Sequence, residues 1–132
     1  VYGIHLPYNK FKSMLEDNYK FDRNKAIGLS LHTVEEVVEL EKIIQNNDIK
    51  IEYITLSHIY ETKCKEGLKP KGIELLKKAR NITKIKIVAL GGILPQNVGE
   101  IVNYCDDFAI MSTLFKSDDV KKTIEEYNEN IK

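Results

Sequence analysis

The sequence predicts an α/β fold built from about five βα units with parallel strands. Strand-like and helix-like patterns alternate from one end of the chain to the other. The strands are nearly continuous apolar runs, which is typical of a parallel sheet covered by helices. Two architectures fit this pattern, an open doubly wound sheet and part of a (β/α)8 barrel. A complete barrel typically needs about 200–250 residues, so the barrel interpretation leaves about three units missing.

The first two units each have a strand followed by a helix. A strand over residues 1–5 precedes a short helix over residues 11–19, which has Phe11, Met14 and Leu15 on one face. A second strand over residues 26–32 leads into a capping box, in which Thr33 accepts from a free N–H and Glu36 bonds back. The helix that follows is expected to end near residues 46–47.

The remaining units follow the same rule. Strands are expected around residues 53–56, 85–90 and 108–111, and a long polar loop up to Pro70 precedes a helix over residues 73–79. Pro95 suits the first turn of a helix, because its missing N–H would be unpaired there in any case. Ser117 is expected to be the N-cap of a last amphipathic helix that runs toward Ile131.

Composition narrows the range of partners. The 132 residues are expected to form a single domain, in which twenty basic residues balance twenty acidic ones. This balance argues against nucleic-acid or membrane binding driven by net charge. No apolar run is long enough to span a bilayer and no signal peptide opens the chain, so a cytoplasmic protein is expected. Cys64 and Cys105 lie far apart without metal-ligand spacing, and reduced thiols are favoured over a disulfide.

The three histidines, His5, His32 and His58, each end a strand-like run. The carboxyl ends of parallel strands form one face of a βα fold, and chemistry takes place there. His58 leaves a buried strand and must find a polar partner or a ligand. His5 and His32 are expected mainly to orient or support other groups. Their spacing does not match a strong metal motif, so no metal site is expected.

Two adjacent turns have the features of a phosphate site. Gly91 and Gly92 directly follow a buried strand, and backbone N–H groups approach a phosphate closely where no Cβ intervenes. Met111 and Ser112 end the next strand and add further N–H groups and a hydroxyl. Taken together, the two turns favour phosphate binding.

Four segments of the chain resemble the thiamine phosphate synthase/TenI family. They are residues 28–33, the loop from His58 to Lys65, residues 89–93 and residues 110–112. The order and spacing of these motifs are more specific than the Gly-Gly-Ile turn alone. The resemblance implies an incomplete (β/α)8 TIM-barrel-type fold in which this chain supplies the last five units. It also implies that His58 aligns with the catalytic histidine of the family.

The resemblance is closest to the TenI branch, the thiazole tautomerases. Synthases of the family have an aspartate that helps hold magnesium where this chain has Lys10. The loop from His58 to Lys65 also resembles that of the tautomerases, with Thr62, Cys64 and Lys65 at the corresponding positions. The implied reaction is aromatisation of a carboxythiazole phosphate by an isomerase, with His58 as general acid/base and no cofactor.

The resemblance also suggests binding roles. The phosphate would sit on Gly91, Gly92, Met111 and Ser112, while Ser30, Thr62, Cys64 and Lys65 are candidates for substrate contacts. A phosphorylated thiazole is therefore the expected ligand. The open edges of an incomplete barrel predict a homo-oligomer. Two alternatives stay open: a thiamine phosphate synthase or its remnant, and a non-catalytic, regulatory phosphate-ligand binder.

Overall fold

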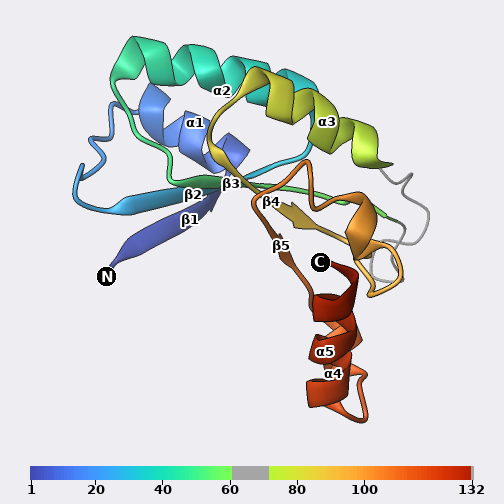
Figure 1. Ribbon diagram of the computed structural model, residues 1–132. Coiled ribbons are helices and arrows are strands. Elements are labelled where there is room, and N and C mark those ends of the chain that lie inside the picture. Colours follow the sequence, from blue (N-terminus) through green and yellow to red (C-terminus); the bar gives the residue numbers. More distant parts are fainter. Residues whose placement is uncertain (61–71, 132) are drawn as a thin grey trace.

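The computed structural model describes residues 1–60 and 72–131 and contains one sheet of five parallel strands (Figure 1). The strands pair in the order in which they occur along the chain. They are β1 (Gly3–Pro7), β2 (Ala26–Leu31), β3 (Tyr53–Leu56), β4 (Lys86–Leu90) and β5 (Asp107–Ala109). A doubly wound sheet reverses its strand order, whereas this one does not. The incomplete-barrel alternative is therefore confirmed.

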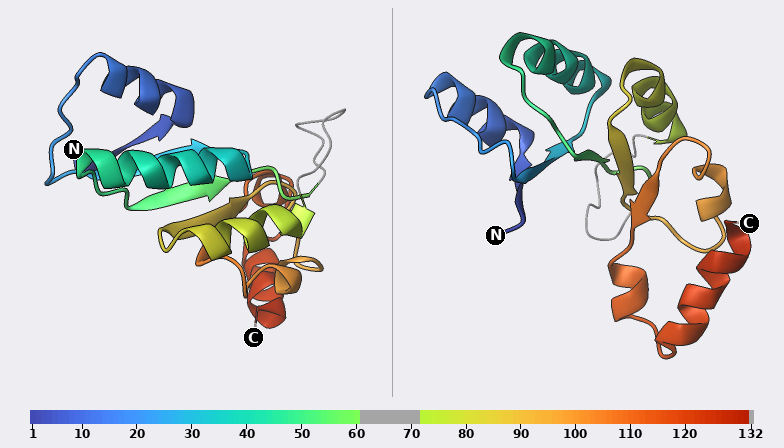
Figure 2. Two further views of the ribbon diagram at one scale, coloured as in Figure 1. Left: turned by 90° about the horizontal axis from the view of Figure 1, so that it is seen from above. Right: turned by 60° about the vertical axis from the view of Figure 1, so that its left-hand side comes forward.

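Three helices lie along the outside of the curved sheet, as Figure 2 shows. They are α1 (Tyr8–Glu16), α2 (Val34–Asn47) and α3 (Gly72–Ile82). The 3₁₀ turn η2 (Val98–Glu100) joins β4 to β5, and a hairpin of α4 (Ser112–Phe115) and α5 (Val120–Asn130) follows β5. The opposite face of the sheet is free of helices in the described part of the chain.

The core lies between the sheet and these outer helices. Strand side chains alternate between faces, and the helix-facing set is almost fully buried. This set comprises Ile27, Leu29, Leu31, Ile54, Leu56, Ile87 and Ala89. Phe11, Val37, Leu40, Leu76 and Ala79 meet it from the helices. Burial on one face therefore fixes which strand residues are left for the other face.

The predicted capping box of α2 is confirmed. Thr33 Oγ1 accepts from the N–H of Glu36 at 3.1 Å, and the Glu36 carboxylate accepts from the Thr33 N–H at 3.1 Å. The same carboxylate accepts from the N–H of His32 at 2.8 Å. Three backbone N–H donors are thus satisfied by side chains where β2 passes into α2.

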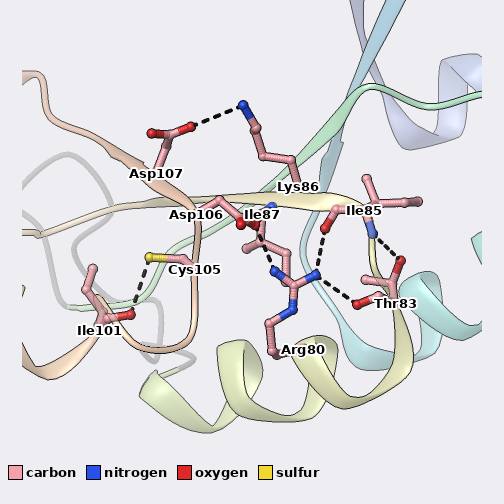
Figure 3. A network of polar contacts seen from close by, with 9 residues as sticks. All are labelled: Arg80, Thr83, Ile85, Lys86, Ile87, Ile101, Cys105, Asp106 and Asp107. Carbon is pink, nitrogen blue, oxygen red and sulfur yellow. Dashed lines mark hydrogen bonds and ion pairs between the residues drawn. The ribbon is translucent and has the colours of Figure 1, made fainter.

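A side-chain network fixes the amino ends of β4 and β5 (Figure 3). The Arg80 guanidinium donates to the carbonyls of Thr83 and Ile85 and to Asp106 at 2.8–2.9 Å. Asp106 also accepts from the N–H of Ile87 at 2.8 Å. This backbone hydrogen bond, together with the Arg80 contact, lowers the pKa of the Asp106 carboxyl. Beside the network, burial raises the pKa of the Cys105 thiol to about 11.

Helix α1 begins earlier than the sequence predicts. It spans Tyr8–Glu16 rather than residues 11–19. Pro7 occupies the N-cap position with φ −59°, so the chain enters the helix as soon as the strand ends. Tyr8 is 2% exposed, because its ring faces the core from the first turn.

The expected helix at Pro95 is wrong. The chain forms turns there and then the short η2. Asn97 accepts from the N–H of Leu94 at 2.8 Å and donates to the carbonyl of Gly92 at 3.0 Å. Such side-chain bonds to nearby backbone compete with helix formation.

The end of the chain also differs from expectation. Strand β5 ends at Ala109 instead of residue 111, and the short α4 starts at Ser112. The N-cap of α5 is Asp119, which accepts from the N–H of Lys122 at 3.0 Å, so Ser117 is not the cap. Ser117 instead pairs with Thr123 Oγ1 at 2.6 Å.

Within the described residues, no helix has the length and apolar character required to cross a membrane.

Candidate phosphate-binding site at the strand ends

The carboxyl ends of β3, β4 and β5 bring the predicted phosphate-binding residues to one edge of the sheet. His58 follows β3 by two residues, Gly91 and Gly92 follow β4 directly, and Met111 and Ser112 follow β5. The strands are parallel neighbours, with Leu56 opposite Ala89 and Leu90 opposite Ala109. The three segments therefore leave the sheet side by side, as the sequence predicts.

Backbone hydrogen bonds join the segment after β3 to the segment after β4. The N–H of Ile59 donates to the carbonyl of Leu90 at 3.1 Å, and the N–H of Tyr60 donates to the carbonyl of Gly91 at 3.0 Å. Gly91 has φ +105°, and a Cβ there would lie 2.5 Å from His58 Cβ. Only glycine satisfies both the backbone angle and this contact.

His58 is buried beneath the glycine turn. The residue is 5% exposed. Its Nε2 is the buried side-chain atom left without a hydrogen-bond partner in residues 1–60 and 72–131. Because an unpaired buried polar atom destabilises the folded protein, a ligand atom at this place would relieve the cost.

The turn at Gly91 and Gly92 has two backbone donors without a partner among the described residues. Gly92 has φ +65°, and Asn97 binds both its carbonyl and the N–H of Leu94. The N–H groups of Gly92 and Ile93 donate to no atom of the described residues. A turn that is fixed by a side chain and presents consecutive N–H groups is suited to an anion.

Met111 and Ser112 lie on the neighbouring strand end. Met111 is 57% exposed, and Ser112 is the first residue of α4. Tyr60 lies on the other side of the glycine turn, where its hydroxyl donates to Glu100 at 2.7 Å. Burial first, and then this carboxylate, raise the pKa of Tyr60. Tyr60 is therefore a hydrogen-bond donor at neutral pH and not a base.

His32 holds two strand ends together. Its Nδ1 lies 3.1 Å from Ser57 Oγ and 3.2 Å from the Ser57 carbonyl oxygen. These contacts connect the end of β2 to the segment that leads into His58. The expected orienting role of His32 agrees with this geometry.

His5 does not lie at a strand end, so the prediction that all three histidines do so is wrong. It lies in the middle of β1, opposite Gly28 of β2. Its Nε2 is 2.6 Å from Ser30 Oγ, and its Nδ1 is 2.9 Å from the Tyr53 hydroxyl. Ser30 thus belongs to a cluster on the helix-free face, separate from the glycine turn.

Three predicted ligand contacts, Thr62, Cys64 and Lys65, lie outside the described residues. The sequence interpretation missed Asn97 and Tyr53. An asparagine two residues after a proline is typical of a side-chain turn, which was a usable signal for Asn97. The only sequence signal for Tyr53 was its place in the alternation of strand residues, which does not indicate a hydrogen-bond partner two strands away.

The described residues do not suit the magnesium site that the family resemblance implies for synthases. Lys10 stands where the synthases have a carboxylate, and it is exposed on α1. A cation cannot replace a magnesium ligand. No group of three or more His, Cys, Asp or Glu side chains gathers within residues 1–60 and 72–131.

Comparison with known proteins identifies the family. The protein-family model described as thiamine monophosphate synthase matches residues 1–114 of this chain. The chain belongs to this family. Thiamine-phosphate synthase 1 of Aquifex aeolicus is 34% identical over 102 residues, which are 76% of this chain and 47% of that protein. Thiamine-phosphate synthase of Clostridium tetani is 30% identical over 130 residues, or 94% of this chain and 56% of that protein.

One solved structure supports the same assignment, and a second shares the fold. A thiamine phosphate pyrophosphorylase from Pyrococcus furiosus superposes with a TM-score of 0.71 at 26% identity, over 99% of this chain and 59% of that one. Nitroalkane oxidase from Streptomyces ansochromogenes, at 15% identity and TM-score 0.52, shares the fold alone. The chain spans about half the length of the curated relatives that it matches.

These findings overturn the expected isomerase. Relatives at 30–35% identity over most of the chain are named thiamine-phosphate synthases, which are transferases. The thiazole tautomerase assignment is therefore wrong. A catalytic role of His58 stays a prediction. The resemblance to the wider family is confirmed, whereas the choice of the TenI branch rested on Lys10 and a few loop residues.

Proposed function

We propose that this chain acts in thiamine phosphate formation, as the part of a thiamine-phosphate synthase that binds the phosphorylated thiazole. The observation that carries the proposal is the glycine turn, in which Asn97 fixes the backbone and the N–H groups of Gly92 and Ile93 donate to no atom of residues 1–60 and 72–131. The names of the relatives supply the reaction class. The strand-end position supports a ligand site, because substrates of βα barrels bind at that face.

In this proposal the residues of the chain bind and orient the thiazole. The N–H groups of Gly92 and Ile93 hold the phosphate oxygens, and the Ser112 hydroxyl on the neighbouring strand end adds a donor. His58 Nε2 contacts the bound ligand and so loses its unpaired state. Holding the phosphate in this way fixes the thiazole ring nitrogen relative to the second substrate.

The transfer itself balances without a proton shuttle at His58. The thiazole nitrogen forms a bond to the methylene carbon of a pyrimidine pyrophosphate, the carbon–oxygen bond to pyrophosphate breaks, and pyrophosphate leaves with the electron pair. The role of the site is positioning, which contributes much of the rate of a two-substrate reaction. No step is assigned to a metal, because Lys10 does not fit as its ligand.

A second candidate function is binding of a phosphorylated ligand without transfer. Lys10 favours it, since the carboxylate of the synthases is missing there. Under this alternative the glycine turn keeps its role, and the protein responds to the ligand instead of consuming it.

Calorimetry with thiazole phosphate tests the binding claim. Asn97→Ala removes the side chain that holds the turn in place. We expect the affinity to fall by roughly tenfold or more, because the hydrogen bonds from the Gly92 and Ile93 N–H groups to the phosphate are weakened. Asn47→Ala is the matched control, since Asn47 donates only to the Ile43 carbonyl on α2. Equal affinities for the wild type and Asn97→Ala would contradict the assigned site.

Adding the pyrimidine pyrophosphate with magnesium then separates the two functions. Release of pyrophosphate that depends on thiazole phosphate supports the transferase. Binding without release supports the second candidate. If thiazole phosphate does not bind to the wild type at all, the transferase proposal is contradicted, and so is a regulatory role for this particular ligand.

A further inference from the structure

A hydrogen-bonded cluster spans three strands on the helix-free face of the sheet. His5 of β1 has both ring nitrogens engaged, Nδ1 by the Tyr53 hydroxyl at 2.9 Å and Nε2 by Ser30 Oγ at 2.6 Å. Ser30 belongs to β2 and Tyr53 to β3. Nothing in the binding of a phosphate at the glycine turn requires this arrangement, so it needs its own explanation.

Gly28 creates the space that Tyr53 occupies. A Cβ at Gly28 would lie 2.2 Å from Tyr53 Cζ and 2.6 Å from its hydroxyl oxygen. The tyrosine ring therefore lies across β2 and reaches His5 on the far side. There it stacks on the imidazole, with centroids 5.5 Å apart and planes inclined by 24°. Packing and hydrogen bonding thus hold the pair in a single geometry.

The chemistry of the three groups gives the chain of hydrogen bonds a direction. A neutral imidazole has one donor and one acceptor nitrogen, so the partner at Nδ1 decides the state of Nε2. A phenol O–H is a stronger donor than an aliphatic hydroxyl, because phenol is the more acidic. With Tyr53 as the donor to Nδ1, the proton of a neutral His5 would reside on Nε2, from which it would be donated to Ser30 Oγ. The Ser30 hydroxyl proton is then free to be donated elsewhere.

We propose that Tyr53, seated on Gly28, is a positioning residue that fixes His5 as the Nε2–H tautomer, so that Ser30 presents its hydroxyl proton to a phosphoryl oxygen of a ligand on this face. Lys86 of β4 lies opposite Tyr53 in the sheet register and is more than half exposed, with its Nζ 3.8 Å from Asp107. It supplies a cation on the same face. The identity of the ligand rests on the proposed function, whereas the tautomer does not.

The first test measures the His5 tautomer without any ligand. In ¹⁵N-labelled protein, the shifts of the two ring nitrogens show which one carries the proton, and His5→Gln assigns the signals. We expect Nε2–H in the wild type and in Ser30→Ala, and a shift toward Nδ1–H in Tyr53→Phe. Tyr8→Phe is the control, because its hydroxyl binds Glu39 on the helix side. An Nδ1–H tautomer in the wild type, or no change in Tyr53→Phe, would overturn the proposal.

The second test measures affinity for inorganic pyrophosphate. Ser30→Ala and Tyr53→Phe should each weaken binding by roughly two- to tenfold, and the double variant should be no weaker than Ser30→Ala. Additive losses, or a loss in Ser30→Ala alone, would contradict the link between the two residues. Thiazole phosphate binding to the wild type is measured in parallel. If thiazole phosphate does not bind, the proposed function is contradicted, whereas the result for the His5 tautomer is unaffected.

Discussion

At the scale of single residues, Gly91 links the fold to the candidate site. The residue has φ +105°, and its hydrogen atom faces His58 where a Cβ would collide with His58 Cβ at 2.5 Å and Cα at 2.8 Å. Its carbonyl also accepts from the N–H of Tyr60. The position is therefore restricted to glycine for a backbone reason and for a packing reason at once.

We expect Gly91→Ala to lower the free energy of unfolding by about 1–3 kcal/mol and to abolish binding of thiazole phosphate. Gly72→Ala separates the two causes, because Gly72 has φ +71° but no heavy atom of the described residues lies within 4 Å of the added Cβ. Urea unfolding and calorimetry of both variants check this. Equal binding by Gly91→Ala and the wild type would show that the turn tolerates the collision and is not the site.

At the scale of elements, the sequence predicted the positions of the strands more accurately than the structure of the segments between them. The β2 and β3 strands follow the predicted runs, because period-two burial against the helices leaves little choice of register. The segment after Gly92 was misread because Pro95 suits a helix start, while a single side chain, Asn97, decides the turn. Side-chain hydrogen bonds of this kind produce no periodic pattern in the sequence.

The Arg80–Asp106 network at the opposite end of the sheet is also invisible to pattern analysis. We expect Asp106→Ala to lower stability by about 1 kcal/mol at neutral pH, since the Ile87 N–H and Arg80 lose an acceptor. Asp107→Ala is the control, because that carboxylate forms only an exposed pair with Lys86 at 3.8 Å. Its effect should stay within about 0.5 kcal/mol.

The pH dependence of this effect has a definite sign. The folded-state pKa of Asp106 is lowered, so its contribution is present above the ordinary carboxyl range and is lost as the pH falls through the folded value. The stability difference between the wild type and Asp106→Ala should therefore shrink in acid. A difference that is constant from neutral to acidic pH would contradict the role given to the ionised carboxylate.

At the scale of the whole molecule, the described sheet has two open edges. Strands β1 and β5 each pair on one side only within residues 1–60 and 72–131. Exposed strand edges favour pairing with another chain. We propose that chains of this sequence associate through these edges. Static light scattering over a concentration series should give a mass above that of one chain. A well-folded monomer at the highest concentration would refute this.

The family was predictable from the sequence because its motifs are spread over four strand ends. The branch was not, because it depended on a few residues in loops, three of which lie outside the described part of the chain. Lys10 is exposed on α1.

If the turn after β4 binds the phosphate of a phosphorylated thiazole, the amide signals of Gly92 and Ile93 must respond to this ligand. Thiazole phosphate is titrated into ¹⁵N-labelled protein while amide spectra are recorded, with the unphosphorylated thiazole alcohol as the control. We expect these two amides to show the largest shifts, which saturate with the phosphate ester and are absent with the alcohol. Unchanged Gly92 and Ile93 amides while the ligand binds elsewhere would contradict it.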